Sequence, residues 1–297
     1  MDVLVVGGTG FVGTHLCREL VDRGHEVTAM SRTPGGAPEG VETVTGDVTA
    51  YDSIEGAFEG RDGVVNLVAL SPLFKPDGGD EMHDVVHRQG TDHCVRAAET
   101  HGVERFVQLS ALGADPNGPT AYIRAKGRAE EIVRESGLDW TIFRPSVVFG
   151  DGGEFVSFTK RLKRLFAPGV PVYPLPGGGK TRFQPVWVGD LVPMIGDALE
   201  EAQHAGEVYE IGGPDTLTLR EVVELVYEAE GTSVSVVGLP MALAGVGLSV
   251  MDAVPGMPMG RDQYRSLKFD NTTSDNDVDA FGADDARLTA FHAYLGV

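Results

Sequence analysis

The chain has 297 residues and a formal net charge of −20, because 44 acidic side chains outnumber 24 basic ones. This balance argues against a nucleic-acid partner, since the phosphates of a nucleic acid would be repelled. Apolar runs are shorter than the roughly eighteen residues of a spanning helix, and neither a transmembrane segment nor a signal peptide is visible. We therefore expect a soluble, cytoplasmic protein.

Charge and cysteine content bear on the environment of the protein. A halophilic protein tolerates self-repulsion because the Debye length falls to about 3 Å in 1 M salt, and we favour this interpretation over an ordinary acidic protein. The two cysteines, Cys17 and Cys94, lie in helical patterns without a C-x-x-C motif. This predicts reduced, buried thiols and no metal site.

The first half of the chain alternates between strand and helix patterns. Short apolar runs, typical of buried strands, are separated by segments with helical spacing. The expected strands are 3–6, 26–31, 41–45, 63–69, 105–110 and 140–144, and the expected helices are 11–23, 53–58, 85–101 and 122–136. The alternation predicts an α/β fold with a doubly wound parallel Rossmann sheet.

After residue 150 the pattern loosens, and Gly and Pro cluster at 168–179. We expect residues 1–150 to form a dinucleotide-binding core and residues 151–297 a smaller α/β lobe for a substrate or partner. The lobe is expected to be interleaved with the core and not to fold independently. Its expected strands are 184–188 and 208–211, and its expected helices are 191–202, 219–230 and 285–294.

Three glycines at a spacing of three follow the first strand, in "VVGGTGFVG". Gly7 allows a tight turn, Gly10 lets the backbone approach a pyrophosphate, and Gly13 lets the following helix pack closely on the sheet. A tight turn without a ligand is the alternative, but the strand before and the helix after favour a cofactor. The expected phosphate-binding residues are Gly7, Thr9, Gly10, Phe11, Val12 and Gly13.

The end of the second strand bears on the choice of dinucleotide. It reads Ala-Met-Ser-Arg-Thr over 29–33 and offers no carboxylate for the ribose hydroxyls that NAD presents. Ser31 and Arg32 suit a 2′-phosphate, which favours NADP(H), with NAD(H) as the alternative. Arg32 is otherwise a solvated loop residue.

The segment "TAYIRAKGRAEE" contains the candidate catalytic pair Tyr122 and Lys126, four residues apart on one helix face. A lysine and an oxidised nicotinamide beside the phenol would lower its pKa from about 10 to about 7 and make Tyr122 a general acid/base. Ser110, at the end of the fifth strand, is the candidate hydroxyl that polarises a carbonyl. Thr120 is a stand-in, because few residues separate Ser110 from Tyr122, and capping of local backbone is the alternative role for Ser110.

The glycine spacing, "TGDV" at 45–48 and "NLVAL" at 66–70 together resemble the short-chain dehydrogenase/reductase superfamily. The resemblance implies that Asp47 and Val48 meet the adenine. It also implies that the segment 67–70, with Leu67, Val68 and Ala69, lines the ribose side of the cofactor.

Later segments resemble one atypical, extended branch of the NAD-dependent epimerase/dehydratase type. These are "FRPSVVFG", "TRFQPVWVGDL", "YEIGGPDTLTLREVVELV" and "GRDQYRSLKFDN", and the branch is similar to the nucleotide-binding accessory subunit of complex I. The resemblance implies tightly held NADP(H), a retained Tyr–Lys pair, and backbone at Pro145 near the nicotinamide.

Two functions follow as expectations. The first is an NADP(H)-dependent oxidoreductase or epimerase acting on a small molecule. The second is a non-catalytic, structural or redox-sensing NADP(H)-binding protein, associated with a membrane-bound respiratory or quinone-related complex. The Met-rich apolar stretch 239–260 is open to two interpretations, as core packing or as a surface for an apolar substrate or partner.

Overall fold

The computed structural model describes residues 1–297 apart from 34, 168, 170–171 and 253–258. The chain forms two compact units, and each is assembled from segments that are distant in sequence. Unit 1 comprises Met1–Leu70, Asp80–Pro145 and Val188–Glu210. Unit 2 comprises Ser71–Gly79, Ser146–Trp187 and Ile211–Val297. Part of the expected C-terminal lobe, Val188–Glu210, thus belongs to unit 1.

Unit 1 is built on a seven-stranded sheet of described residues, in the order β11-β6-β5-β4-β1-β2-β3. The strands are β1 (Asp2–Val6), β2 (Glu26–Ser31), β3 (Glu42–Thr45), β4 (Gly63–Asn66), β5 (Arg105–Leu109), β6 (Asp139–Pro145) and β11 (Glu207–Ile211). Strands β1 to β6 pair in parallel. The order reverses between β1 and β4, and ligands of such sheets bind beyond the carboxyl ends of the strands at this point. The expected doubly wound α/β fold is confirmed.

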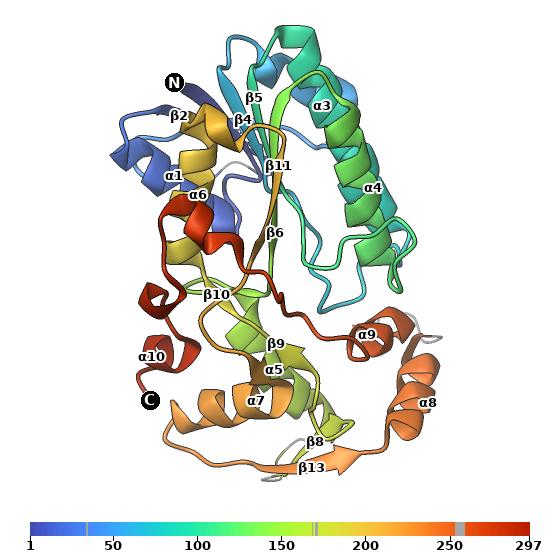
Figure 1. Ribbon diagram of the computed structural model, residues 1–297. Coiled ribbons are helices and arrows are strands. Elements are labelled where there is room, and N and C mark those ends of the chain that lie inside the picture. Colours follow the sequence, from blue (N-terminus) through green and yellow to red (C-terminus); the bar gives the residue numbers. More distant parts are fainter. Residues whose placement is uncertain (34, 168, 170–171, 253–258) are drawn as a thin grey trace. The chain divides into compact units, whose positions relative to one another are not determined.

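Helices cover both faces of this sheet (Figure 1). On one face lie α1 (Phe11–Asp22) and α6 (Val188–Glu200), and on the other lie α3 (Gly90–His101) and α4 (Ala121–Glu135). The short α2 (Tyr51–Ile54) continues into a 3-10 turn. Both faces of β1 are covered, which is why Val3 to Val6 are all buried and this strand reads as a continuous apolar run.

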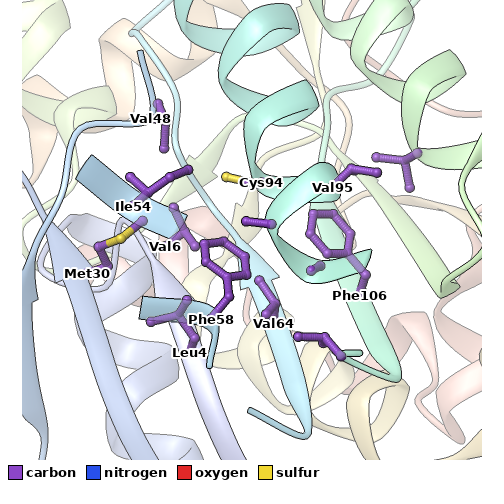
Figure 2. Packing of buried hydrophobic residues seen from close by; sticks show 14 of the residues in the cluster. Leu4, Val6, Met30, Val48, Ile54, Phe58, Val64, Cys94, Val95 and Phe106 are labelled. Atoms are coloured by element: carbon purple, nitrogen blue, oxygen red, sulfur yellow. The ribbon is translucent and has the colours of Figure 1, made fainter. Parts of the chain in front are cut away.

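The core of unit 1 fills the space between the sheet and α3 (Figure 2). Leu4, Phe58 and Phe106 are fully buried there, and each large side chain of this kind contributes roughly 1.5–3 kcal/mol by leaving water. The thiol of Cys94 lies in the same cluster. Cys94 and Cys17 are both buried and free, as the sequence predicted, and burial raises the pKa of each thiol.

Unit 2 is built from short strands and several helices. A parallel pair, β8 (Val172–Pro176) and β13 (Ser235–Leu239), packs with α5 (Glu154–Phe166) and α7 (Leu219–Glu228) around buried Tyr173, Leu175 and Val223. The other elements are β7 (Val148–Phe149), β9 (Arg182–Phe183), β10 (Val186–Trp187), β12 (Leu217–Thr218), α8 (Met241–Asp252), α9 (Arg261–Ser266) and α10 (Phe291–Leu295).

The apolar stretch 239–260 divides between core and surface. On α8, Leu248 is 4% exposed, whereas Leu243, Val246 and Val250 are each more than 60% exposed, at 64%, 64% and 62%. Within the stretch, residues 253–258 lie outside the described part of the chain. Among the described helices of the chain, none combines the length and apolar character that crossing a membrane requires.

Several expected boundaries are wrong. The strand expected over 63–69 ends at Asn66, because the Asn66 side chain accepts a hydrogen bond from Val68 N at 3.3 Å and turns the chain. The helix expected over 85–101 begins as a π-helix, Asp84–Gln89, and becomes α-helical at Gly90. The helix expected over 285–294 is a 3-10 turn, Asp285–Arg287, followed by the separate α10.

The other expected elements of the C-terminal half also shift. The strand expected over 184–188 is reduced to β10, and the helix expected over 191–202 begins earlier, with α6 at Val188. The strand expected over 208–211 is present as β11, and it pairs with β6 at the edge of the main sheet.

Candidate functional site

The turn between β1 and α1 has the form of a phosphate cradle. Gly7 has a φ of +85°, which favours glycine. A Cβ on Gly13 would lie 2.3 Å from the carbonyl oxygen of Gly7, so only glycine lets α1 start this close to the turn. Helix α1 begins after Gly10, which has no side chain to cap it, and no acidic residue lies in its first turn. The N-terminal N–H groups and the positive end of the helix dipole therefore suit an anion such as a pyrophosphate.

The loop after β4 lies directly against this cradle. Val68 lies next to the α-carbon of Gly7. A Cβ added to Gly7 would be 3.4 Å from both the Val68 side chain and the Val68 backbone nitrogen. Buried Asn66, the last residue of β4, anchors the start of this loop. Its side-chain amide donates to Gln108 Oε1 at 2.9 Å and to Thr91 Oγ1 at 3.2 Å. Of the segment assigned to the cofactor, Leu67 is buried, Val68 is half-buried and Ala69 is exposed. The Asn66 network was not predicted from the sequence.

The ends of β2 and β3 carry the residues expected at the ribose and adenine. Arg32 is exposed, and Ser31 Oγ donates to Thr33 O at 2.8 Å. The pKa of Asp47 is lowered because Thr49 donates hydrogen bonds to its carboxylate from N and Oγ1, at 2.9 and 2.8 Å, and because Arg32 lies near. The end of β2 has no carboxylate, but the carboxylate of Asp47, which follows β3, lies near Arg32. Val48 is buried beside it, 6% exposed.

Helix α4 carries four polar residues on one face, each four residues after the last: Tyr122, Lys126, Glu130 and Arg134. Thr120 is the N-cap of this helix, where its hydroxyl oxygen accepts from Ile123 N at 3.2 Å. Gly127 lets the helix lie against the loop that follows β5, since a Cβ there would be 2.3 Å from Asp115 C. The local sequence therefore fixes both the start of α4 and its contact with the carboxyl end of β5.

Lys126 is anchored at that end of the sheet. Its side chain is buried, with 2% of the residue exposed, and its Nζ donates to Leu109 O at 2.8 Å. Burial lowers the pKa of Lys126 to about 8, against the opposite influence of Glu130. Nζ lies 5.9 Å from the centroid of the Tyr122 ring. An ammonium group with this pKa can both hold a positive charge and release a proton near neutral pH.

The pKa of Tyr122 departs from the expectation in the opposite direction. Burial raises it, whereas the sequence analysis expected a lysine and a cofactor charge to lower it. The Tyr122 ring packs edge-on against His83 at 5.5 Å and His87 at 5.3 Å between centroids. Burial therefore keeps the phenol protonated at neutral pH and, by raising its pKa, makes it a weaker acid than a free tyrosine.

Ser110 faces Glu130. Its hydroxyl donates to Glu130 Oε1 at 2.6 Å, and Arg144 donates to both carboxylate oxygens, from Nε at 2.9 Å and from Nη2 at 2.7 Å. Arg134 adds a further bond to Oε2 at 3.0 Å. Pro145 follows Arg144 at the end of β6 and is buried, with its carbonyl accepting from Leu112 N at 3.1 Å. Glu130 was not predicted as a site residue, although its position four residues after Lys126 places it on the same helix face.

His87 completes this group, and the sequence analysis did not single it out. The residue is 2% exposed, and its Nε2 accepts a hydrogen bond from Leu70 N at 2.8 Å. Its pKa lies well below the ordinary value because it is buried and because Lys126 and His83 are near. The spacing of four between His83 and His87 in a helical segment was the available signal.

Comparison with known proteins bears on the family of the chain. The family model for NAD(P)H-binding proteins matches residues 7–164. The chain is 29% identical over 291 residues to the mitochondrial NADH dehydrogenase (ubiquinone) 1 alpha subcomplex subunit 9 of Arabidopsis thaliana, covering 92% of this chain and 71% of that protein. It is 27% identical over 265 residues to the NAD(P)H azoreductase of Xenophilus azovorans, covering 85% and 84%.

Among solved structures, the UDP-glucose 4-epimerase of Thermus thermophilus, in complex with NAD, superposes with a TM-score of 0.64. The identity is 22%, and the match covers 90% of this chain and 99% of that one. The chain belongs to the family of NAD(P)H-binding proteins.

Proposed function

We propose that the protein is an NADP(H)-dependent oxidoreductase that interconverts a carbonyl and a hydroxyl group on a small, apolar molecule. The observation that carries the proposal is the placement of Tyr122 and Lys126. Both lie on one face of α4, and Lys126 Nζ binds Leu109 O at the carboxyl end of β5. The glycine cradle of β1 and α1 lies at the carboxyl edge of the same parallel sheet, where a dinucleotide is expected.

The residues of the chain divide the chemistry between them. A bound nicotinamide supplies or accepts the hydride. In the direction of reduction, the protonated Tyr122 phenol gives its proton to the carbonyl oxygen as a general acid. The phenolate left behind is stabilised by the Lys126 ammonium and regains a proton from solvent by way of Lys126. In an epimerase the same pair would act twice, with Tyr122 first removing and later returning the hydroxyl proton.

The cofactor preference rests on Arg32 and Ser31 at the end of β2. An exposed guanidinium there can form charge-assisted hydrogen bonds to a 2′-phosphate, which NAD(H) lacks. Ser31 donates to Thr33 O and keeps its oxygen available as an acceptor only. Arg32 is therefore the main discriminating residue in this proposal, and NAD(H) is the alternative cofactor.

A second candidate function is that of an NADP(H)-holding partner of a respiratory complex without turnover. Two observations favour it. The plant relative that covers most of this chain is named as a subunit of mitochondrial NADH dehydrogenase. In addition, the proton of Ser110, the expected polarising hydroxyl, is engaged by Glu130.

The experiment that separates the two candidates uses the purified full chain. Mass spectrometry of the released cofactor identifies the dinucleotide, and loss of NADPH absorbance is followed with a panel of aldehydes, ketones and quinones. We expect NADP(H) to be released and at least one apolar carbonyl to be reduced. Full occupancy by NADP(H) with no turnover on the panel would support the non-catalytic candidate instead.

A further inference from the structure

The tautomer of His87 follows from its hydrogen bonding. A backbone N–H can only donate, so the bond from Leu70 N requires Nε2 of His87 to be the unprotonated acceptor. The buried imidazole is neutral at neutral pH, because burial and the neighbouring Lys126 and His83 oppose a positive charge. The single ring proton must therefore be on Nδ1.

The Nδ1–H group is in an unusual position for a donor. It is buried, and in the part of the chain that the structure describes it has no hydrogen-bond partner. Buried donors are nearly always paired with protein, water or a ligand. The ring that carries this donor packs edge-on against Tyr122, with 5.3 Å between centroids, and Lys126 is near enough to lower its pKa, so the ring lies within the group around the proposed catalytic pair.

The backbone conformation accounts for this placement. His87 lies in the π-helix Asp84–Gln89, which widens the winding immediately before α3 begins at Gly90. Segments of this kind inside helices are frequent at functional sites. Gly90 packs on Val48, since a Cβ there would meet Val48 Cγ2 at 2.8 Å, and this contact fixes the end of the π-helix.

A second donor is also needed beside Tyr122. A carbonyl oxygen that accepts hydride at its carbon is best stabilised by two hydrogen bonds, because the developing alkoxide has more than one lone pair to satisfy. The Ser110 hydroxyl donates its hydrogen bond to Glu130 Oε1 at 2.6 Å, and Thr120 Oγ1 accepts from Ile123 N at 3.2 Å at the start of α4, which engages its oxygen but not its proton. His87 Nδ1–H is a buried donor that is not engaged in either way.

We propose that His87 is a catalytic residue that donates a hydrogen bond from Nδ1 to the substrate oxygen next to Tyr122, in the role for which Ser110 was expected. This inference rests on the proposed function of the same site. No proton leaves His87 in the step: Tyr122 supplies the proton, and His87 stabilises the negative charge on the oxygen. The bond from Leu70 N to Nε2 sets the tautomer that makes this possible.

The first test concerns the ring itself. Nitrogen-15 chemical shifts of the histidines, measured on the full chain, distinguish protonated Nδ1 from protonated Nε2, and His87→Asn assigns the signal. We expect His87 to carry its proton on Nδ1 at neutral pH and to stay neutral well below the usual titration range of histidine. A proton on Nε2, or titration in the ordinary range, would overturn the proposal.

The second test uses two variants that keep different halves of the ring. The amide of His87→Asn reaches about as far as Nδ1 and retains a donor there, whereas the amide of His87→Gln reaches the position of Nε2 and retains an acceptor for Leu70 N. The probes are cyclohexanone and methylenecyclohexane, which differ by an oxygen acceptor, added to the full chain with NADP⁺ so that no ketone is reduced.

The expected result is a selective loss. His87→Gln should bind cyclohexanone about ten-fold more weakly than the unchanged chain, and His87→Asn should recover most of that affinity, in keeping with one hydrogen bond. Binding of methylenecyclohexane should not change in either variant. A purely structural role of His87 predicts the reverse: cyclohexanone affinity would be kept in His87→Gln and reduced in His87→Asn. That result would contradict the proposal. Equal binding of the two probes by the unchanged chain would contradict it as well.

The two readouts also separate this inference from the proposed function. Neither requires turnover, so a chain that reduces no carbonyl would contradict the proposed function while the ring proton and the probe affinities still report on His87. Conversely, turnover that depends on Tyr122 but is unaffected by His87→Gln would overturn only the role of His87. If neither variant folds, the His87 Nδ1 shift of the unchanged chain is compared with and without cyclohexanone, and a shift that does not respond would overturn the proposal.

Discussion

The Ser110 hydroxyl donates a hydrogen bond of 2.6 Å to the carboxylate of Glu130. Glu130 is 2% exposed and is also bound by Arg144 through two hydrogen bonds. The carboxylate thus ties the carboxyl ends of β5 and β6 to the middle of α4, the helix that carries Tyr122 and Lys126. Its role in this arrangement is to hold the candidate pair against the sheet.

Replacing Glu130 should therefore destabilise unit 1. Glu130→Gln leaves the half-buried guanidinium of Arg144 with only the more distant Glu210 carboxylate, at 3.5 Å, as counter-charge, and we expect a loss of about 2–4 kcal/mol in the free energy of unfolding. Urea denaturation measures this loss. The neighbouring Glu131→Gln is the control, because Glu131 is exposed and should change stability by less than about 0.5 kcal/mol. Equal effects of the two variants would contradict the role assigned to Glu130.

The pKa of Lys126 gives the stability a dependence on pH. Its pKa falls from 10.5 to about 8 on burial, so between these values the unfolded chain binds more protons than the folded chain. Stability should therefore rise with pH in this window, by about 1.5 kcal/mol between about pH 8 and about pH 9.5. The measurement is the difference in unfolding free energy between the unchanged chain and Lys126→Met, which lacks the titrating group.

The control for this measurement is Lys180→Met, because Lys180 is exposed. Its difference from the unchanged chain should be the same at both pH values. A Lys126→Met difference that is also independent of pH would show that Lys126 keeps an ordinary pKa in the folded protein.

Arg32 should discriminate between the dinucleotides. Arg32→Ala removes a hydrogen bond to a charged group, so NADPH binding should weaken by about 1.5–3 kcal/mol and NADH binding should hardly change. Calorimetric titration with both nucleotides measures the two effects. Arg18→Ala, which removes an exposed arginine from α1, is the control for loss of positive charge. Equal losses for NADPH and NADH in Arg32→Ala would contradict the NADP(H) preference.

The two faces of α8 should differ in their effect on stability. Leu248 is 4% exposed, and Leu248→Ala should cost about 2–4 kcal/mol through lost burial and a cavity. Val246 is 64% exposed on the same helix, and Val246→Ala should cost about 0.5 kcal/mol or less. Chemical denaturation of both variants tests the division of the stretch 239–260. A similar cost at the two positions would mean that the outer face of α8 is covered in solution.

The parts of the fold that the sequence predicted are those with local signals. The glycine spacing from Gly7 to Gly13 and the apolar runs of β1 and β2 each depend on neighbours in sequence, and these elements lie where they were expected. Elements of unit 2 without such signals were missed. Strand β8 lies within the Gly- and Pro-rich segment 168–179, and only Val236 and Leu239 of β13 are even half-buried, so neither strand has the apolar pattern of the strands in the main sheet.

The candidate site was only partly predictable for a similar reason. Tyr122 and Lys126 share a helix face, which spacing alone reveals. The bond from Ser110 to Glu130 spans twenty residues and depends on how α4 packs on β5. The capping role of Thr120 was readable, because Thr before a helical run is a common N-cap. The placement of His87 was not, because it arises from a π-helix, whose wider turn does not follow the helical period.

The central claim is that Tyr122 is the general acid/base of an NADP(H)-dependent reaction, and the most direct measurement is the turnover of Tyr122→Phe on a carbonyl that the unchanged chain reduces. We expect turnover to fall by about a hundred-fold or more, with NADPH affinity unchanged, because only the phenolic proton is lost. Tyr51→Phe, on α2, is the matched control and should retain full turnover. Turnover of Tyr122→Phe within a few-fold of the unchanged chain would contradict the claim.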